Sequence, residues 1–339
     1  MRLSDFRYHV PDELIAQTPT RPRDASRLMC VRRGSGEITH HLFRDLPDLL
    51  DSRYTLVLNN SRVIKARLLA RRSDGATVDI YLLKDLGGGV WSCVGNEQAA
   101  PKVSEAVTFQ DSAMHGAVVA HRDDGSFELR LSAPDGVAVE LERVGRVPLP
   151  PYVKDRSGED RYQTVYARID GSVAAPTAGL HFTPAVLARL EQKGIRREEI
   201  TLHVGYGTFA PVRTEDIAAH EMPTEAYALA PEAALRLNAD RQDGRKILAV
   251  GTTATRTLES RVDDHGALRS GSGETRLFIH PPYRFRCVDA LLTNFHMPAL
   301  TPVMLVAALA GYELTMRAYQ IAVQERYRFY SFGDSMLVL

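Results

Sequence analysis

The chain is poor in cysteine, carries no excess of charge of either sign and has no long apolar run. Its 3 cysteines stand far apart without a CxxC pair, which argues against a secreted disulfide framework and against a zinc site. Lys plus Arg total 42 and Asp plus Glu total 42, so a polyanionic partner would need a local basic patch. We therefore expect a protein of the reducing cytoplasm that holds no metal.

Segments that would direct the chain to a membrane or out of the cell are also lacking. The first residues carry charges and have no apolar core of the kind that an export signal needs. The longest apolar run, Val303 to Ala310, falls short of the roughly 20 residues of a membrane span and ends at Gly311. It predicts a buried helix, and we expect no membrane partner.

Several segments alternate between strand-like and helix-like patterns. Thr55 to Leu58 is an apolar run that stops at a polar loop, as a buried strand would. Thr183 and Pro184 are a capping residue and a first helical residue, and Gly194 marks the end of that helix. Four further apolar stretches are expected to be short strands. They lie at 200–204, 246–250, 276–279 and 288–292. Together these signals predict an α/β core.

The pattern changes between about residues 65 and 147. Short alternating runs are separated there by turn residues at 87–89, 123–125 and 134–136, which is hairpin spacing. Pro148, Pro150 and Pro151 form a stiff connector where this region ends. We expect a small all-β domain at 65–147, inserted into an α/β core formed by 1–64 and 148–339.

Basic residues are concentrated near the N-terminus. Residues 1–72 hold fourteen basic side chains against eight acidic ones, an excess of six, and arginine is preferred to lysine. Arginine suits bidentate contacts with phosphate, so the excess permits a nucleic-acid partner. The alternative is that arginine serves simply as a solvated cation.

Two glycine-containing loops could lie against a ligand. Gly179 and His181 precede the predicted helix at Pro184, where free backbone amides could face an anionic or polar group, although a loop histidine can equally be structural. Gly205 and Gly207 follow the strand at 200–204 and allow a close backbone approach. The third glycine and the acidic residue of a dinucleotide fingerprint are missing, which disfavours a nicotinamide site.

The segment after the strand at 246–250 combines a glycine, two hydroxyls and a charged pair. Thr252 and Thr253 could cap a helix and hold a carboxylate, with Arg256 as a clamp and Glu259 on the same helical face. The alternative is a well-capped helix with a surface ion pair. No phosphate-binding P-loop pattern occurs in the chain.

Two segments near the C-terminus place polar groups beside apolar ones. Asn294 and His296 follow an apolar strand, at the edge where open α/β sheets bind ligands. Residues 327–334 alternate aromatic and polar residues, which could stack on bases or could belong to the core.

Read in order, these segments resemble one family, the S-adenosylmethionine:tRNA ribosyltransferase-isomerases of queuosine biosynthesis. The matching pieces follow one another from end to end of the chain, so that each is weak alone and the ordered set is specific. They lie at 14–17, 23–28, 58–64, 162–167, 171–182, 203–212, 250–260, 288–298 and 327–334.

The resemblance implies an α/β fold, with a barrel-like α/β core and an inserted β-barrel, and a defined reaction. The ribosyl moiety of S-adenosylmethionine would be transferred and isomerised onto 7-aminomethyl-7-deazaguanine at the wobble position of tRNA, giving epoxyqueuosine, adenine and methionine. Alternatives are a diverged paralogue acting on another deazapurine or nucleotide acceptor, and a non-catalytic tRNA-binding module. We expect a monomer without a metal.

The resemblance also assigns candidate residues to three roles. Removal of a proton beside the sulfonium and protonation of the departing adenine need a base and an acid, and the candidates are His181, His203, Glu259 and His296. Candidates for holding S-adenosylmethionine are Gly179, Gly205, Gly207, Thr252, Thr253, Arg256 and Asn294. Candidates for contacting tRNA are Arg23, Arg27, Asn60, Arg62, Tyr327, Arg328 and Asp334.

Overall fold

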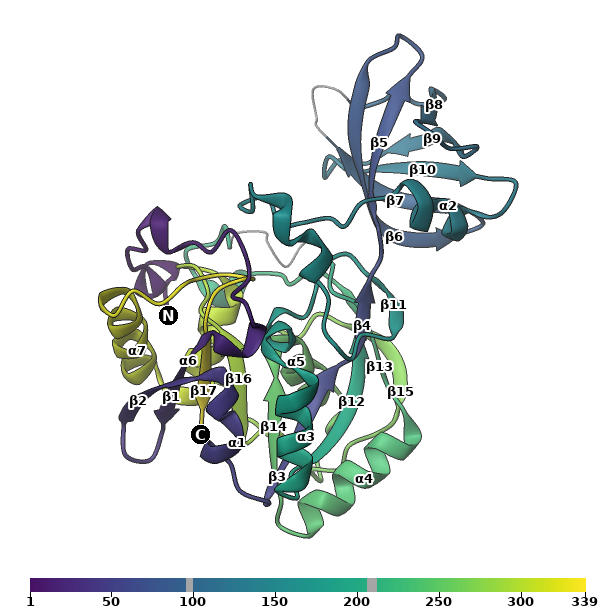
Figure 1. Cartoon of the computed structure of the whole chain (residues 1–339). Helices are drawn as coiled ribbons and strands as arrows, with labels where there is room; N and C mark the ends of the chain where they lie inside the picture. Colours follow the sequence, from purple (N-terminus) through teal and green to yellow (C-terminus); the bar gives the residue numbers. More distant parts are fainter. Residues whose placement is uncertain (96–99, 206–211) are drawn as a thin grey trace. The chain divides into compact units, whose positions relative to one another are not determined.

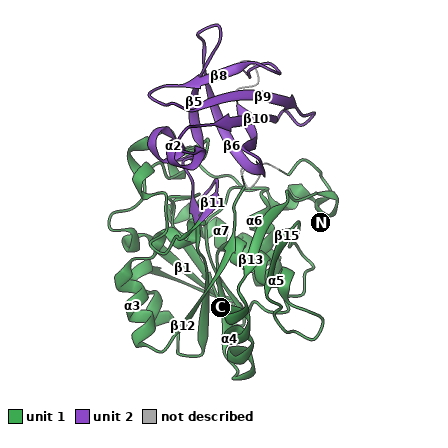
Figure 2. Ribbon diagram, turned by 90° about the vertical axis from the view of Figure 1, so that its right-hand side faces the viewer, with its two compact units in different colours: residues 1–61, 150–169, 175–339 green, residues 62–149, 170–174 purple. Residues whose placement is uncertain are grey.

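The structure, a computed structural model, describes residues 1–95, 100–205 and 212–339 and divides into two compact units (Figures 1 and 2). Unit 1 contains residues 1–61, 150–169 and 175–339, and unit 2 contains residues 62–149 and 170–174. The segment 170–174 groups with unit 2 although nothing in the sequence distinguishes it from the core.

Unit 1 is built on a mixed sheet of nine strands. In spatial order they are β15 (Gly271–Thr275), β13 (Glu225–Leu229), β12 (Arg196–Leu202), β3 (Tyr54–Asn59), β14 (Lys246–Val250), β16 (Ala290–Asn294), β17 (Ser335–Val338), β1 (Arg27–Arg32) and β2 (Glu37–Leu42). The predicted α/β class is confirmed. Within the described residues this sheet is open, with β15 and β2 at its edges, whereas the core was expected to be barrel-like.

The centre of the sheet is parallel. β3 pairs in parallel with both β12 and β14, and β14 pairs in parallel with β16, so the carboxyl ends of these four strands meet at one edge. β3 and β14 lie where the apolar runs predicted strands, while β16 begins two residues later than expected. The strand expected at 276–279 is absent. Its chain has left the sheet after β15, and Ile279 packs its side chain into the core.

Different helices cover the two faces of this sheet. Met29 and Val31 of β1 pack with α6 (Thr301–Ala310) and α7 (Tyr312–Gln324), whereas Leu28 and Cys30 of the same strand pack with α1 (Leu46–Leu49) and α3 (Pro184–Gln192). Because successive strand residues point to opposite faces, a strand buried on both sides needs a continuous apolar run. Such runs are visible in this sequence.

Two helices of unit 1 begin and end as the sequence predicts. In α3 the hydroxyl of Thr183 accepts a hydrogen bond from the backbone N–H of Val186 at 3.3 Å, and Gly194 follows with a φ of 72°. The apolar run at 303–310 lies in α6, and Gly311 ends it with a φ of 88°. Positive φ values favour glycine, which explains both stops.

Unit 2 contains a closed barrel of six antiparallel strands. They are β5 (Arg67–Arg72), β6 (Thr77–Gly87), β7 (Val90–Gly95), β8 (Ala106–Phe109), β9 (His115–His121) and β10 (Phe127–Ser132). Alternate residues such as Leu68, Ile80 and Leu129 fill its interior, as the period of two requires. The expected barrel-like insert is confirmed. The turn at 134–136 leads into helix α2 (Val137–Val144) and not into a hairpin.

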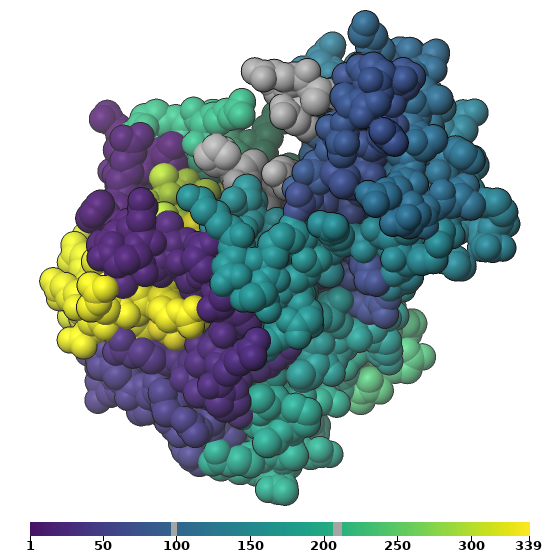
Figure 3. Space-filling view, turned by 45° about the horizontal axis from the view of Figure 1, so that its top comes forward, coloured from purple at the N-terminus to yellow at the C-terminus, as the bar shows by residue number. Residues whose placement is uncertain are grey.

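The remaining helices and strands lie outside the large sheet and the barrel. They are α4 (Pro231–Gln242), α5 (Gly251–Arg261), the paired strands β4 (Ser61–Val63) and β11 (Ile169–Ser172), and the 3₁₀ helices η1 (Leu3–Phe6), η2 (Asp12–Leu14), η3 (Arg23–Ala25), η4 (Phe43–Asp45), η5 (Arg156–Arg161), η6 (Thr177–His181) and η8 (Ile217–Ala219). N-terminal residues lie against C-terminal ones, where Ile15 pairs with Phe329 (Figure 3).

Within the described ranges, none of the helices combines the length and apolarity of a membrane span. The three cysteines are buried and unpaired.

Candidate functional site

Segments far apart in the sequence meet around one cavity in unit 1, at the carboxyl ends of β14 and β16. This is the edge where ligands bind in open α/β sheets. Most of the lining residues come from η6 and the residues before it, from the first turn of α5, from the end of β16 and the loop after it, and from the turn before β17. The lining residues are Tyr152, Ala175, Pro176, Thr177, Ala178, Val204, Gly251, Thr252, Thr253, Thr293, Asn294, His296, Leu300, Pro302, Tyr330 and Ser331.

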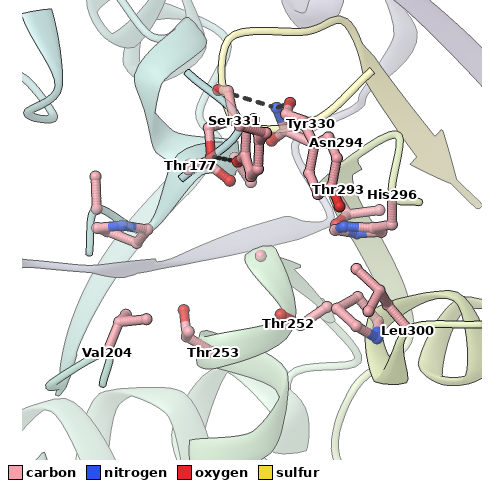
Figure 4. Close-up of a pocket in the computed structure, with 16 residues that line it drawn as sticks. Thr177, Val204, Thr252, Thr253, Thr293, Asn294, His296, Leu300, Tyr330 and Ser331 are labelled. Carbon is pink, nitrogen blue, oxygen red and sulfur yellow. Dashed lines mark hydrogen bonds between the residues drawn. The ribbon is translucent and has the colours of Figure 1, made fainter. Parts of the chain in front are cut away.

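Hydroxyl and amide groups stand on opposite sides of this cavity. Figure 4 shows Thr252 and Thr253 across from Asn294, Tyr330 and Ser331. Gly251, with a φ of 88°, turns the chain from β14 directly into α5, so the two threonines lie in the first helical turn and do not cap it. The hydroxyl of Thr253 accepts a hydrogen bond from the Asn59 amide at 3.2 Å. The wall thus offers positioned polar groups to a ligand.

His296 is the catalytic candidate that lines the cavity. Its Nε2 and the Thr293 hydroxyl form a hydrogen bond of 2.8 Å, and its backbone carbonyl accepts one from the Tyr8 hydroxyl at 2.5 Å. Burial lowers the pKa of His296 to about 3, because a charged imidazolium would lose its hydration. The ring is therefore uncharged near pH 7.

Asn294 and His181 form a second polar group beside the cavity. The Asn294 amide N–H₂ donates to the Tyr330 carbonyl at 3.0 Å, and the Asn294 side chain also interacts with His181. His181 bonds through Nδ1 to the Ser26 hydroxyl at 2.7 Å and stacks on Phe43. Burial lowers the pKa of His181 to about 4, and hydrogen bonding to Asn294 partly opposes this shift. Asn294 is thus held by two neighbours at the cavity wall.

The other loop candidates lie near the cavity without lining it, as far as the described residues go. Gly179 is packed against Tyr166 and Thr164, so it serves close packing of η6 and does not offer an open cradle. The backbone N–H of His203 bonds to Ala226, and the N–H of Gly205 approaches the Glu225 carboxylate at 3.4 Å. Gly207 lies outside the described residues.

Arg256 and Glu259 do not form the surface ion pair that was one alternative. Arg256 is buried and pairs with Glu225, and its Nε donates to the Leu277 carbonyl at 2.9 Å. It lines a smaller cavity that shares Thr252 and Thr253 with the main one.

Glu259, expected to be a general acid or base, is bound to several neighbours within the fold, and its catalytic role stays a prediction. Its carboxylate accepts the backbone N–H groups of Arg286, Cys287 and Val288 at 3.0, 3.0 and 2.9 Å, and the Tyr283 hydroxyl at 3.2 Å. The side chain is 1% exposed and anchors the loop before β16.

Three residues expected to contact tRNA are buried and hydrogen-bonded within the fold, and their contact with tRNA stays a prediction. Tyr327 is 0% exposed and bonds to His40, and Asp334 is 2% exposed and accepts the N–H groups of Arg27 and Arg328. Asn60, 5% exposed, donates to Glu199 and accepts from the Thr201 hydroxyl.

The four arginine candidates are tied to neighbouring groups. Arg23 donates to the carbonyls of Gln163 and Arg161, Arg27 lies 3.7 Å from the Tyr327 ring centroid, and Arg328 donates to Thr20 and to the Thr18 carbonyl. In unit 2, Arg62 makes ion pairs with Glu142 at 2.8 Å and with Asp170 at 2.6 Å.

Two tyrosines of the cavity were missed in the sequence. The rings of Tyr152 and Tyr330 are stacked, with centroids 3.8 Å apart and planes 14° apart. The prolines before Tyr152 were interpreted as a connector, and the aromatics around Tyr330 were assigned as a group to bases or to the core. Within the described residues, no three His, Cys, Asp or Glu side chains cluster as metal ligands would.

Comparison with known proteins identifies the family. A family model described as queuosine biosynthesis protein matches residues 3–338. A protein of Symbiobacterium thermophilum, named S-adenosylmethionine:tRNA ribosyltransferase-isomerase, is 51% identical over 341 residues, with 100% of both chains covered. A protein of the same name from Desulfitobacterium hafniense is 45% identical, again with 100% of both chains covered.

A solved structure supports the same relationship. The crystal structure of an S-adenosylmethionine tRNA ribosyltransferase from Thermotoga maritima covers 99% of this chain and 100% of its own, at 37% identity and a TM-score of 0.58. The chain therefore belongs to the queuosine biosynthesis protein family, the family of the S-adenosylmethionine:tRNA ribosyltransferase-isomerases.

Proposed function

We propose that this chain transfers and isomerises the ribosyl moiety of S-adenosylmethionine onto 7-aminomethyl-7-deazaguanine at the wobble position of tRNA. The products are epoxyqueuosine in tRNA, adenine and methionine. The observation that carries the proposal is the single cavity into which η6, the first turn of α5 and the loop after β16 converge, in a chain that matches the family from residue 3 to residue 338.

The polar groups of the cavity are suited to hold S-adenosylmethionine as the ribosyl donor. Thr252 and Thr253 offer hydroxyls, and Asn294 places a side-chain amide at the cavity wall. A few hydroxyl and amide groups of this kind fix the orientation of a ligand in its pocket. These residues are the proposed donor-binding group.

Proton transfer is assigned first to His296. Removal of a proton from the carbon beside the sulfonium needs an unprotonated base at the cavity surface. His296 lines the cavity, and its lowered pKa leaves its ring unprotonated at neutral pH. His181, which interacts with Asn294, is proposed to position that amide. Since tRNA is the proposed acceptor, we place the activity in the cytoplasm. We also propose that the protein acts as a monomer.

Adenine release tests this function. With S-adenosylmethionine and a tRNA carrying the aminomethyl base, adenine should appear, and omission of either substrate should abolish it. His296→Ala should lower the rate by about 100-fold or more, the usual contribution of a general base. His265→Ala changes an exposed histidine in the turn after α5 and serves as the matched control.

Two results would contradict the proposal at different points. If the unaltered chain releases no adenine from an authentic substrate tRNA, the function itself is wrong. If His296→Ala keeps most of the activity, the function stands and another group transfers the proton. Supplying the acceptor as a free nucleoside separates the tRNA reaction from that of a nucleoside transferase.

A further inference from the structure

Two tyrosines, Tyr152 and Tyr330, stack on each other at the wall of the cavity. Tyr152 and Tyr330 belong to segments separated by more than half of the chain, and both rings line the cavity. Their parallel stack has a centroid separation of 3.8 Å. Because each ring covers one face of the other, a ligand can stack only on an outer face of the pair, beside the hydroxyl and amide groups of the cavity.

Tyr330 occupies a backbone conformation that is rare for a large side chain. Its φ is 71°, in the left-handed region that favours glycine. The conformation is fixed from both sides, because its N–H donates to the Phe295 carbonyl at 2.9 Å and its carbonyl accepts from the N–H of Gly333 at 3.0 Å. The same carbonyl accepts the Asn294 amide. A ring kept at a strained position points to a role for the ring itself.

Tyr152 is anchored independently of Tyr330. Its hydroxyl and the Ser331 hydroxyl are 2.5 Å apart, and its carbonyl accepts a hydrogen bond from the Gln17 amide at 3.1 Å. Pro150 and Pro151 restrict the backbone just before it. Both rings are therefore ordered before a ligand arrives, so that little conformational entropy is lost on stacking.

We propose that the Tyr152–Tyr330 pair is the stacking surface for a fused heteroaromatic base in this cavity. The proposal rests on the proposed function, which brings two such rings to the site: the adenine of the donor and the 7-deazaguanine of the acceptor. Aromatic rings bind either base through its π face, while the neighbouring Asn294 and threonine groups can bond its edge. Burial raises the pKa of both phenols, so the rings stay uncharged at neutral pH.

Substitutions at the two positions can remove the rings and spare the backbone. Tyr330→Asn deletes the ring and keeps a residue that tolerates positive φ, whereas Tyr330→Phe keeps the ring as a matched control. Tyr152→Leu and Tyr152→Phe form the second pair, and Tyr152→Phe also removes the hydrogen bond to Ser331. Thermal unfolding of each variant shows whether the fold is retained.

Two binding measurements on the full chain distinguish the sources of the base. The first is the Kd for S-adenosylmethionine, measured by calorimetry with and without RNA. The second is the ratio of the Kd values for two anticodon stem-loops, one carrying the aminomethyl base and one abasic at the wobble position. Loss of base stacking should weaken the affected Kd, or reduce that ratio, by about fivefold or more.

Each outcome decides a separate point. A weaker S-adenosylmethionine Kd in Tyr330→Asn, with Tyr330→Phe unchanged, assigns the surface to adenine, and a reduced stem-loop ratio assigns it to the wobble base. If neither quantity changes in folded Tyr330→Asn and Tyr152→Leu, the pair is a structural contact and the inference is wrong. If Tyr330→Asn weakens binding of one probe while the unaltered chain releases no adenine, the proposed function fails and the stacking surface stands.

Discussion

Replacing Glu259 by glutamine should destabilise the protein without acting on the chemistry. The carboxylate accepts three backbone N–H groups at 2.9–3.0 Å from consecutive residues, and 1% of the side chain is exposed. Glutamine retains one acceptor oxygen and turns an N–H₂ group toward the remaining donors. At least one buried donor then loses its partner, and the surviving bonds lose their charge.

The size of the effect follows from these contacts. Hydrogen bonds to a charged group contribute about 1.5–3 kcal/mol each, and an unsatisfied buried donor costs about 1–3 kcal/mol. Because glutamine keeps part of the network, we expect Glu259→Gln to lower the free energy of unfolding by about 2–4 kcal/mol. In a domain of this size, each kcal/mol of lost stability lowers Tm by about 2–4 °C, so Tm should fall by roughly 4–16 °C.

Thermal unfolding followed by circular dichroism measures the change, with Glu191→Gln on the exposed side of α3 as the matched control. That control should stay within about 0.5 kcal/mol of the unaltered protein. Adenine release, measured well below the lowered Tm, should remain close to normal in Glu259→Gln. An unchanged Tm together with a hundredfold loss of rate would refute the argument and return Glu259 to the catalytic groups.

Three further predictions concern buried histidines, one close-packed glycine and one surface arginine. The folded-state pKa values of His181 and His296, about 4 and about 3, lie below the unfolded value of about 6.5, so between pH 6 and 5 the unfolded chain binds protons that the folded chain does not. The free energy of unfolding should therefore fall as the pH falls. Replacing either residue by glutamine should reduce this pH dependence, measured by urea titration, by about 1.4 kcal/mol per pH unit. An unchanged pH dependence would mean that the folded ring is already charged. Gly179→Ala should destabilise by about 1–3 kcal/mol, because the added methyl meets the Tyr166 hydroxyl, and adding Tyr166→Phe should restore part of the loss in a double-mutant cycle. Arg62 is already paired with two carboxylates, so Arg62→Ala should change the salt dependence of tRNA binding by less than one charge; a decrease of a full unit in the slope would show that this arginine binds phosphate.

The parts of the fold that the sequence predicts are those fixed by local pattern. β14 is a continuous apolar run because the sheet is buried on both faces, and α3 has its cap, its proline and its glycine stop. What the sequence hides depends on distant partners. The pairing of β1 with β17 joins residues near the two ends, and the run at 276–279 is apolar because it packs into the core outside the sheet.

In the candidate functional site, too, some residues could be predicted from the sequence and others depend on the folded chain. Asn294, His296 and Thr252 follow strands that run in parallel, so topology alone brings them to one edge and their convergence could be foreseen. Tyr327 and Tyr330 occur in one aromatic segment and have opposite fates, one in the core and one at the cavity. An extended chain places residues 327 and 330 on opposite sides, but the spacing does not tell which side faces the core and which faces the cavity.

The place of β17 within the sheet has a consequence for how the protein matures during translation. This strand lies between β16 and β1, and the contact from Arg27 to Asp334 spans 307 positions. Until residues 335–338 have left the ribosome, β1 and β2 lack the neighbour that joins them to the other strands. The growing chain therefore exposes two unmatched sheet edges until this strand is in place, and such edges are where nascent proteins associate wrongly. Substitutions within residues 335–338 should accordingly affect yield more than equivalent changes at the turn between β1 and β2.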